Sequence, residues 1–331
     1  MAPPPFASPV DFERFGDSGG WAKEPAVGGD RDDGSFRRAA YPFRGRIEPG
    51  GEFPPAAGRY VIYASYACPW AQRQLIVREL KGLSQAIGLA AVDPVRDGRG
   101  WAFRAGPDLT GDPYNGFTLL RQAYDATEPG YPGHISVPVL WDTQARRIVS
   151  NNFPDISLDL GSQFNDWAAN PGLDLYPEAA RPQIDQLNAR VYDTVNNGVY
   201  RCGFARSQAA YDQAVGALFE SLDWLEARLA DRIYLLGDHL TEADVRLYPT
   251  LARLDAVYAT HFKTNLRRLV DYPNLWDYTR FLHQQPAFAN TTKFDHIKRH
   301  YFLTHPHINP ARIIPAGYQV DWNAPTRRRR P

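Results

Sequence analysis

The junction between residues 59–66 and Pro69 constrains the fold of this chain more than any other feature. The segment RYVIYASY is β-branched and aromatic, which is typical of a buried strand. Cys68 and Pro69 follow it, and residues 72–83 then place apolar side chains at helical spacing. Proline is favoured in the first turn of a helix, because its missing N–H would have no partner there. Cys68 is therefore predicted to lie at the N-terminus of a helix that directly follows a strand.

The chemistry of Cys68 has two interpretations. The unpaired backbone N–H groups and the partial positive charge of a helix N-terminus stabilise a thiolate, which is the reactive form. The second cysteine of a C-x-x-C motif is absent, because position 71 is alanine. A disulfide within the motif is excluded, whereas a mixed disulfide with a small thiol remains open. The alternative is that Cys68 is a small buried apolar residue, and the flanking Tyr66 and Trp70 do not decide the matter.

The rest of the first half alternates between strands and helices. Residues 87–95 read as a second strand, and a long irregular stretch follows at residues 96–134. Strands are expected at residues 136–142 and 145–152, joined by a DTQ turn, before a helix at residues 155–164. The first two strands should be parallel, with the intervening helix as crossover, and the last two should form a hairpin.

The second half is helical in its periodicity. Helices are expected within residues 211–231, 240–262 and 274–285. Thr241 and Asp244 are placed as the N-cap residue and the N3 acid of the middle helix. The fold class is therefore an α/β domain followed by an all-α domain. The apolar stripe of the first helix consists of Val215, Leu218, Phe219, Leu222, Leu225 and Leu229.

These patterns divide the chain into four parts. Residues 1–55 are rich in proline, glycine and charge, and read as an extended arm that wraps the body or is partly disordered. Residues 56–170 form the α/β domain with its long insert, and residues 171–318 form the helical domain, in which residues 173–189 read as a linker. Residues 319–331 form a tail. Wrapping of the arm is favoured by its four phenylalanines, Phe12, Phe15, Phe36 and Phe43.

Charge and cysteine content narrow the function classes. The 331 residues include 37 Lys+Arg and 37 Asp+Glu, and this balance argues against general nucleic-acid binding. The basic run Arg327–Arg330 reads as a solvated tail, with a local anion contact as the alternative. No apolar run approaches the ~20 residues that span a bilayer, and the N-terminus has no secretory-signal pattern. With only two cysteines, we expect a protein of the reducing cytoplasm that has no membrane association.

A second marker lies at Val137-Pro138. Proline is unusual inside a β-run, because it cannot donate a hydrogen bond to the sheet, and a cis peptide bond at the edge of an active site would explain it. Together with the earlier Cys68, this is the pattern of a thioredoxin-like fold. In that fold, the residue before the cis-proline presents its backbone to the cysteinyl part of a thiol ligand.

At this point a resemblance becomes specific. The segments CPWAQR, VPVLWD, GVYRCGFA, LTEADVRL, DYPNLW and FDHIKRHY…INP resemble those of the xi-class glutathione transferases, the glutathionyl-hydroquinone reductases. The resemblance covers roughly residues 30–318. It implies the glutathione transferase fold, with a thioredoxin-like N-terminal domain and an all-α C-terminal domain. It also implies a homodimer without a permanently bound cofactor or metal.

The resemblance further implies a reaction and its residues. Cys68 is the implied nucleophile, which attacks the sulfur of a thiol-conjugated hydroquinone and forms a mixed disulfide that a second thiol releases. Tyr200 and Tyr301 are implied to bracket the quinol, where a phenol hydroxyl can hydrogen-bond to the leaving oxygen. The alternative for each tyrosine is a core aromatic with a satisfied hydroxyl. The implied thiol site consists of Trp101, Val137, Pro138, Ser150, Asn151 and Asn152.

The chain departs from the family at the end of the last strand. Glutathione-using members carry Ser-Asn-Glu-Ser there, and the acid and the final serine hold the γ-glutamyl end of glutathione. Here, Asn152 replaces the acid and Phe153 the serine. Because the loss of one partner of a charge pair costs ~2 kcal/mol or more, glutathione is expected to bind poorly. Mycothiol, which has no γ-glutamyl group, is the predicted alternative thiol, unless Asp155 takes over the role of the acid.

Further interpretations of single residues and of the activity stay open. Cys202 is either a resolving thiol or, as we favour, a cysteine packed in a helix. His296 and His300 lie one turn apart but lack an obvious third metal ligand. The same thiolate would also serve a conjugating transferase or a reductive dehalogenase, and a non-catalytic thiol-binding protein could share the fold. The intact Cys68-Pro69-Trp70 motif argues against the non-catalytic alternative.

Overall fold

The computed structural model describes residues 4–17 and 33–329. These residues form two compact units. Helix α12 (Phe294–Thr304) belongs to unit 1, although its sequence position lies within the expected helical domain, because its aromatic residues pack on the long insert. The expected N-terminal arm is divided between the units. Unit 1 contains residues 4–17, Ala39–Leu173 and Lys293–Ile314, and unit 2 contains residues 33–38, Asp174–Thr292 and 315–329.

Unit 1 is built on a four-stranded sheet with the order β2-β1-β3-β4. The first strand pairs in parallel with β2, with Tyr60 opposite Ile87, and antiparallel with β3, with Tyr60 opposite Asp142. The β3–β4 pair is antiparallel. The predicted parallel pair and the predicted hairpin are both confirmed. The strands are β1 (Tyr60–Ala64), β2 (Ile87–Ala91), β3 (Val139–Asp142) and β4 (Arg147–Ser150).

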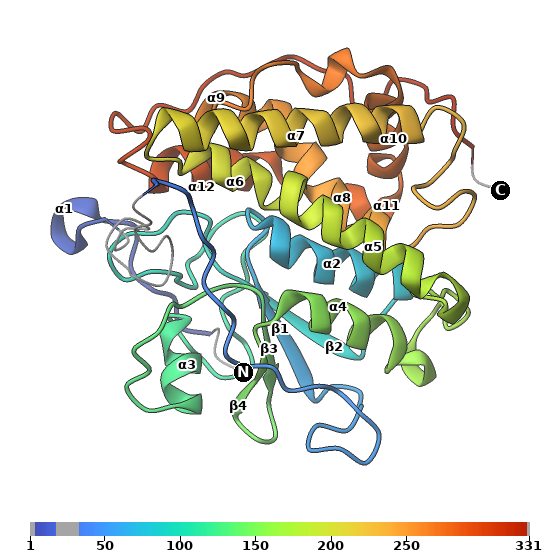
Figure 1. The fold of residues 1–331 in the computed structure, drawn as a ribbon. Coiled ribbons are helices and arrows are strands. Elements are labelled where there is room, and N and C mark those ends of the chain that lie inside the picture. The colour runs from blue at the N-terminus through green and yellow to red at the C-terminus, as the bar shows by residue number, and fades with distance from the viewer. Residues whose placement is uncertain (1–3, 18–32, 330–331) are drawn as a thin grey trace. The chain divides into compact units, whose positions relative to one another are not determined.

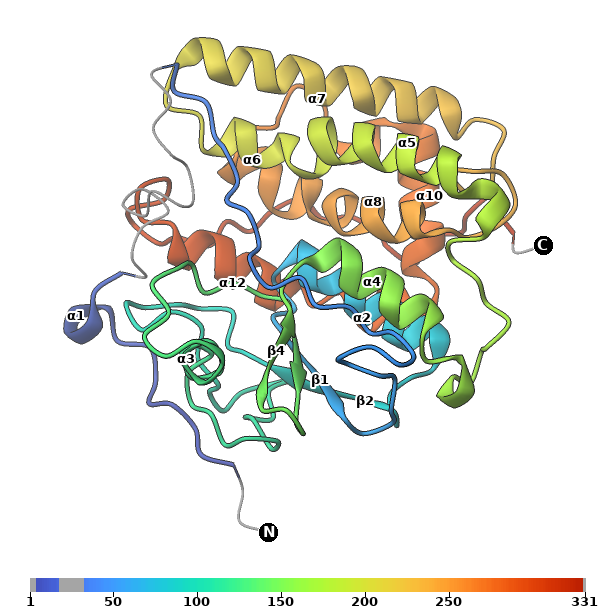
Figure 2. The ribbon, with the colours of Figure 1, turned by 60° about the horizontal axis from the view of Figure 1, so that its bottom comes forward.

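Helices α2 (Pro69–Lys81) and α4 (Phe153–Ser162) lie together over one face of this sheet (Figures 1 and 2). A buried amide joins them, because Gln74 Nε2 donates to the Phe153 carbonyl at 2.6 Å and to Ser157 Oγ at 2.9 Å. The predicted helix after Cys68 is thereby confirmed. It begins at Pro69, a position in the first turn where the missing N–H of proline costs no hydrogen bond.

The long insert contains one helix that the sequence did not reveal. Helix α3 (Arg121–Thr127) packs against β4. It has seven residues and buries only Ala123 and Tyr124, so it is too short for a helical period to be visible in the sequence. The expectation of an irregular stretch across residues 96–134 is wrong at this point.

The first described part of the arm lies along the insert. In residues 4–17, the Ala7 N–H donates to the Phe103 carbonyl at 2.8 Å. The Asp11 N–H donates to the buried carboxylate of Asp97 at 3.2 Å. These two bonds attach residues distant in sequence, which explains how a segment without periodicity is ordered.

The phenylalanines of the arm have separate surroundings. Phe12 belongs to the one-turn helix α1 (Phe12–Phe15). The guanidinium carbon of Arg312 lies 3.7 Å from the centroid of the Phe12 ring. Phe43 packs edge-on against Tyr124 at 5.7 Å between ring centroids. Phe36 is buried in unit 2. Residues 18–32 of the expected arm lie outside the described residues.

Unit 2 consists of helices. Helix α5 lies partly in the stretch that we expected to be a linker, and this expectation is wrong. Pro182, which reads as a helix breaker, occupies the first turn of α5, where it costs no hydrogen bond. The helices are α5 (Arg181–Val191), α6 (Gly198–Gly203), α7 (Gln208–Arg228), α8 (Glu242–Arg253), α9 (Ala259–His261), α10 (Pro273–His283) and α11 (Pro286–Ala289), with π-helical segments at Tyr192–Asn196 and Leu254–Tyr258.

The two predicted features of these helices are confirmed. The apolar stripe of α7 is buried along its length. Thr241 and Asp244 form the capping box of α8. The same carboxylate accepts hydrogen bonds from the Leu235 N–H at 2.9 Å and from the Tyr278 hydroxyl at 2.8 Å. One acid therefore caps a helix and connects it to two neighbouring segments.

Within the basic run at residues 327–330, Arg328 packs against the helices of unit 2. Its side chain is 7% exposed, and it forms an ion pair with the buried carboxylate of Asp277. It also donates to the Leu229 carbonyl at 2.5 Å. The preceding residue, Arg327, adds a backbone N–H bond to Asp277 at 2.9 Å. The expectation of a solvated tail is wrong for Arg328, and Arg330 lies outside the described residues.

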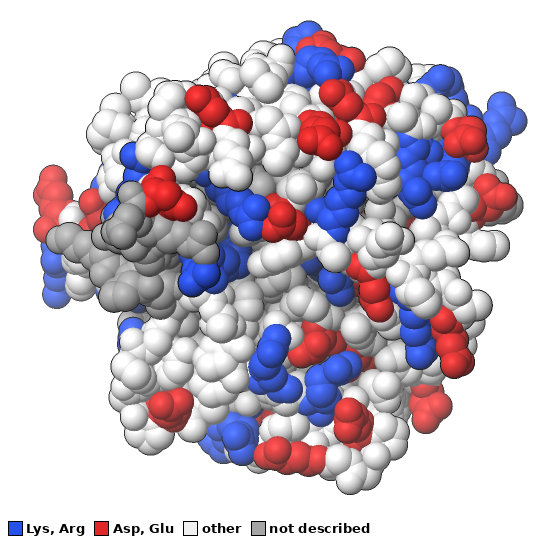
Figure 3. All heavy atoms as spheres, in the orientation of Figure 1, with Lys and Arg blue, Asp and Glu red and all other residues white. Residues whose placement is uncertain are grey.

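The surface carries mixed charge. Lys and Arg side chains are interspersed with Asp and Glu over the face shown in Figure 3, as the balanced composition leads us to expect. Within the described part of the chain, no helix combines the length and the apolar character needed to cross a membrane.

Candidate active site

Cys68 lies at the place that the sequence predicts. It is the N-cap residue of α2, directly before Pro69, and it is buried, at 9% exposure. Its own N–H donates to the Ser65 carbonyl at 3.0 Å, which fixes the turn between β1 and the helix. The thiol sulfur is 3.5 Å from the backbone oxygen of Val137. The Val137-Pro138 peptide bond is cis, so both markers found in the sequence meet at one point.

Trp101 lies in the insert and contacts helix α12. Its indole stacks on the His300 ring with 5.2 Å between centroids and 14° between planes, and the Arg96 guanidinium lies 4.7 Å from the indole centroid. The Nδ1 atom of His300 is 2.7 Å from the Pro94 carbonyl. Because a carbonyl only accepts, Nδ1 carries the proton and the ring orientation is fixed.

The indole N–H of Trp101 is a buried donor without a hydrogen-bond partner among the described residues. The side chain as a whole is 5% exposed. A buried donor that lacks a partner costs about 1–3 kcal/mol. Such a group is a ready donor to a bound molecule, which agrees with the predicted place of Trp101 in a thiol site.

Tyr301 is buried on α12, at 1% exposure. Its ring contacts His300 edge-on at 5.2 Å. The same helix reaches the β1–α2 turn, because His296 packs edge-on against Tyr66 at 5.7 Å and lies 3.2 Å from the Pro107 carbonyl through Nε2. Burial lowers the pKa of His296, so this histidine is neutral near pH 7. Among the described residues, no group of three or more His, Cys, Asp or Glu side chains could hold a metal ion.

Ser150 and Asn151 hold the N-terminal arm. The Ser150 hydroxyl donates to the Phe43 carbonyl at 3.2 Å, and the Asn151 side-chain oxygen accepts from the Phe43 N–H at 3.2 Å. The amide nitrogen of Asn151 donates to the Tyr124 hydroxyl at 3.3 Å. These side chains therefore have a structural task in addition to the thiol-binding role that the resemblance implies for them.

Asn152 is directly linked to a carboxylate. Its amide nitrogen donates to Asp155 Oδ2 at 2.5 Å, and the Arg46 guanidinium lies 3.9 Å from the other oxygen of that carboxylate. Phe153 is buried at 3% exposure and packs on Trp70 at 4.7 Å. The acid missing from position 152 is thus present one helical turn later, where it accepts a hydrogen bond from Asn152 and forms a long ion pair with Arg46, while the aromatic ring fills the core.

Two arginines near this corner were not identified from the sequence. Arg73 is buried, with its guanidinium 4.8 Å from the Trp70 ring and 5.0 Å from the Phe153 ring. The spacing of residues 70 and 73 on one helix was a usable signal, because residues three apart share a face. Arg46 binds Asp159 on α4 at 2.5 Å, and nothing in the sequence connects two residues so far apart.

Tyr200 lies in unit 2, on α6, and is 4% exposed. The Arg38 guanidinium lies 4.6 Å from its ring centroid, and the rings of Phe36 and Phe262 lie 6.5 Å and 5.3 Å away. An arginine also lies on the ring of the fully buried Tyr272, at 4.4 Å, so this contact does not by itself separate Tyr200 from a core aromatic. Two residues later, burial raises the pKa of the Cys202 thiol to about 12, which argues against a resolving thiolate.

Comparison with known proteins gives consistent results. Residues 208–280 match the family model of the glutathione S-transferase C-terminal domain. The chain is 48% identical over 284 residues to the glutathionyl-hydroquinone reductase PcpF of Sphingobium chlorophenolicum, covering 86% of this chain and 90% of that protein. It is 46% identical to the glutathionyl-hydroquinone reductase YqjG of Escherichia coli, covering 88% and 92%.

Solved structures agree with these relatives. The glutathione transferase Xi of Phanerochaete chrysosporium superposes with a TM-score of 0.85 at 48% identity, over 88% of this chain and 100% of that one. The glutathione-bound structure of Escherichia coli YqjG gives a TM-score of 0.83 at 44% identity, over 86% and 96%. The predicted fold, a thioredoxin-like domain with an all-α C-terminal domain, is confirmed.

Proposed function

The chain belongs to the glutathionyl-hydroquinone reductases, the xi class of glutathione transferases, and we propose that it removes a small thiol from S-conjugated hydroquinones. The observation that carries this proposal is the position of Cys68. Its sulfur lies at the N-terminus of α2, where the helix stabilises negative charge. It also lies 3.5 Å from the carbonyl of the residue before the cis-proline.

The proposed reaction has two steps. The Cys68 thiolate attacks the sulfur of the thioether, a sulfur–sulfur bond forms, and the carbon–sulfur bond breaks. The aryl carbon keeps the electron pair and takes up a proton, so the free hydroquinone leaves. A second small thiol then attacks the mixed disulfide, releases the oxidised thiol as a disulfide and restores Cys68. The two thiols supply the two electrons that reduce the conjugate.

Seven residues are assigned supporting roles. The indole N–H of Trp101, which lacks a partner among the described residues, donates to a polar group of the thiol. The hydroxyls of Tyr200 and Tyr301 hydrogen-bond the quinol oxygens and stabilise charge on the leaving ring. The backbone of Val137 and Pro138 contacts the cysteinyl part of the small thiol. Asn152 and Asp155 bind the polar end of the same thiol.

Two small thiols are candidates for the co-substrate, and each has an observation in its favour. Glutathione is supported by the glutathione-bound relative from Escherichia coli and by the carboxylate of Asp155. Mycothiol, our proposal from the sequence, is supported by the engagement of that carboxylate with Asn152 at 2.5 Å and its approach to Arg46 at 3.9 Å. A carboxylate that already has these two partners is less available as a counter-ion for the ammonium of a γ-glutamyl group.

Turnover with the two thiols tests both parts of the proposal. With the matching thiol-conjugated hydroquinone as substrate, chromatography should show one hydroquinone and one thiol disulfide formed per conjugate consumed. We expect faster turnover with mycothiol than with glutathione. Equal rates would contradict the mycothiol assignment alone, whereas the absence of hydroquinone release with either thiol would contradict the reductase assignment.

A further inference from the structure

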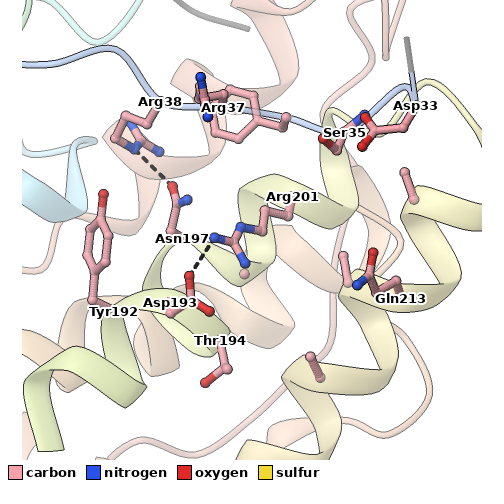
Figure 4. Close-up of a pocket in the computed structure, with 15 residues that line it drawn as sticks. Asp33, Ser35, Arg37, Arg38, Tyr192, Asp193, Thr194, Asn197, Arg201 and Gln213 are labelled. Carbon is pink, nitrogen blue, oxygen red and sulfur yellow. Dashed lines mark hydrogen bonds and ion pairs between the residues drawn. The ribbon is translucent and has the colours of Figure 1, made fainter. Parts of the chain in front are cut away.

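Unit 2 contains a cavity of about 510 Å³ that none of the proposed reaction steps uses. It lies between the arm segment at residues 33–38 and the helical face formed by the π-helical segment Tyr192–Asn196, α6 and α7 (Figure 4). Its volume falls in the range of sites for small organic ligands. We infer that this cavity is a binding site for a small organic oxyanion, a carboxylate or phosphate ester with a compact apolar body.

The charge of the cavity comes from three guanidinium groups. Arg37 and Arg38 extend from the arm segment, and Arg201 extends from α6 on the opposite wall (Figure 4). Guanidinium groups recognise carboxylates and phosphates through paired N–H donors. Three of them around one cavity therefore define the chemistry of the occupant.

The orientation of two of these cations is fixed by neighbours. Arg38 donates from Nε to Asn197 Oδ1 at 2.9 Å, and its guanidinium lies on the Tyr200 ring at 4.6 Å. Arg201 forms an ion pair with Asp193 at 2.5 Å. Donors whose orientation is fixed before binding lose less entropy when a ligand arrives.

The third cation has no such partner. Among the described residues, none forms a hydrogen bond or an ion pair with the Arg37 guanidinium. The carboxylate of Asp33, which also lines the cavity, accepts from the Ser35 N–H at 2.9 Å and lies at the far end of the arm segment from Arg37 (Figure 4). The lining contains three arginines and two aspartates, Asp33 and Asp193, so it has an excess of one positive charge.

The shape of the cavity has a local cause. Four of the residues on its helical side are glycine or alanine and leave the space open, and the π-helical segment adds its own side chains to the wall. Single-turn π-helical distortions often occur at functional sites. The small residues are Gly198, Ala210, Ala214 and Ala217.

The arm segment is attached at both ends, so the cavity is a built feature of unit 2. At one end, the Arg206 N–H donates to the Gly34 carbonyl at 2.9 Å, and the Ser207 hydroxyl donates to the Asp33 carbonyl at 2.8 Å. At the other end stands the Arg38–Asn197 bond. Gly34 has φ of +74°, and a Cβ there would lie 3.0 Å from Ser207, so the attachment favours glycine.

Calorimetric titration of the full chain at low salt tests the inference, with benzoate and phenyl phosphate as probes and benzamide as their neutral counterpart. We expect both anions to bind and benzamide to bind at least about tenfold more weakly, since a hydrogen bond to a charged group contributes about that factor or more. The stronger of the two anions identifies the preferred headgroup. Raising the salt concentration should weaken binding of both anions.

Variants locate the site. The double variant Arg37→Gln/Arg201→Gln should bind the anions at least about tenfold more weakly, and Ala217→Leu should do so by filling the cavity without a change of charge. Arg232→Gln, which removes a guanidinium of unit 2 outside the cavity lining, should leave affinity unchanged. Thermal melting verifies that each variant is folded.

Several results would overturn the inference. They are benzamide binding as tightly as benzoate, unchanged anion affinity in both the double variant and Ala217→Leu, and absence of binding heat for both anions. The reductase proposal stands or falls separately, because Cys68→Ser should abolish hydroquinone release and leave anion affinity unchanged.

Discussion

At the scale of single residues, two tryptophans of unit 1 share one feature in different surroundings. Trp101 and Trp141 are both buried, and neither indole N–H has a hydrogen-bond partner among the described residues. Trp141 lies within strand β3 at 0% exposure, whereas Trp101 stacks on His300 in the insert. The same chemical feature is thus part of the sheet core in one place and belongs to the proposed thiol site in the other.

This contrast provides a matched pair of variants. Trp101→Phe keeps an aromatic ring but removes the donor, so KM for the thiol conjugate should rise roughly tenfold while kcat changes little. Trp141→Phe should leave KM unchanged and lower stability only. Steady-state kinetics with the conjugated hydroquinone measures both. An equal rise of KM in the two variants would show that general loosening, and not the lost donor, is responsible.

Cys202 gives a second prediction at this scale. Because burial raises its pKa to about 12, the thiol stays protonated across the working pH range, and thiols react as thiolates. Cys202→Ala should therefore keep the turnover number of the wild type, within about twofold at any pH from 6 to 9. A turnover that falls in the variant and is restored by added small thiol would establish a resolving role.

At the scale of elements, buried charges attach segments that lack periodic patterns. The carboxylate of Asp159 on α4 binds two residues of the arm. It forms an ion pair with Arg46 at 2.5 Å and accepts a hydrogen bond from the Ile47 N–H at 2.9 Å. The carboxylate of Asp277 on α10 binds the tail in the same way. It forms an ion pair with Arg328 and accepts a hydrogen bond from the Arg327 N–H. Each of these carboxylates is buried, so each needs its partner. The irregular ends of the chain are therefore ordered by specific charge pairs.

The tail pair can be tested by stability. Arg328→Gln removes one guanidinium from a carboxylate that is 3% exposed and leaves Arg280 at 3.6 Å, so it should lower the free energy of unfolding by about 2 kcal/mol. Arg327→Gln is the matched control, because its side chain is 67% exposed and 3.9 Å from the same carboxylate; we expect a loss of at most ~1 kcal/mol. Urea unfolding measures both. Equal losses would mean that Arg328 acts as a surface charge.

At the scale of the whole molecule, the features predicted from sequence are those with a local cause. The β1–α2 junction, the parallel β1–β2 pair, the β3–β4 hairpin and the capping box of α8 follow from periodicity, proline placement and spacing within a few residues. The cis bond at Val137-Pro138 was predicted for the same reason. The pairing of β1 with β3 was not predicted, because it joins strands that are distant in the sequence. The resemblance to the family then supplied the candidate roles of residues that spacing alone does not connect.

What could not be predicted depends on partners distant in the chain. Ser150 and Asn151 read as thiol ligands, yet they also bind the arm at Phe43. The assignment of α12 to unit 1 depends on its packing against Trp101 and Tyr66. Helix α3 was missed because it is too short for its period to show, and α5 was missed because Pro182, in its first turn, reads as a helix breaker.

The central claim is that Cys68 carries the thiol between two steps of one reaction. Intact-protein mass spectrometry after brief incubation with a thiol-conjugated hydroquinone, without free thiol, tests this claim most directly. The wild type and Cys202→Ala should gain the mass of one thiol molecule less two hydrogens, which is that of a mixed disulfide. Cys68→Ser should show no such gain, and added thiol should remove it from the other two proteins. Hydroquinone release by the wild type without an adduct, or an adduct of the same mass on Cys68→Ser, would contradict it.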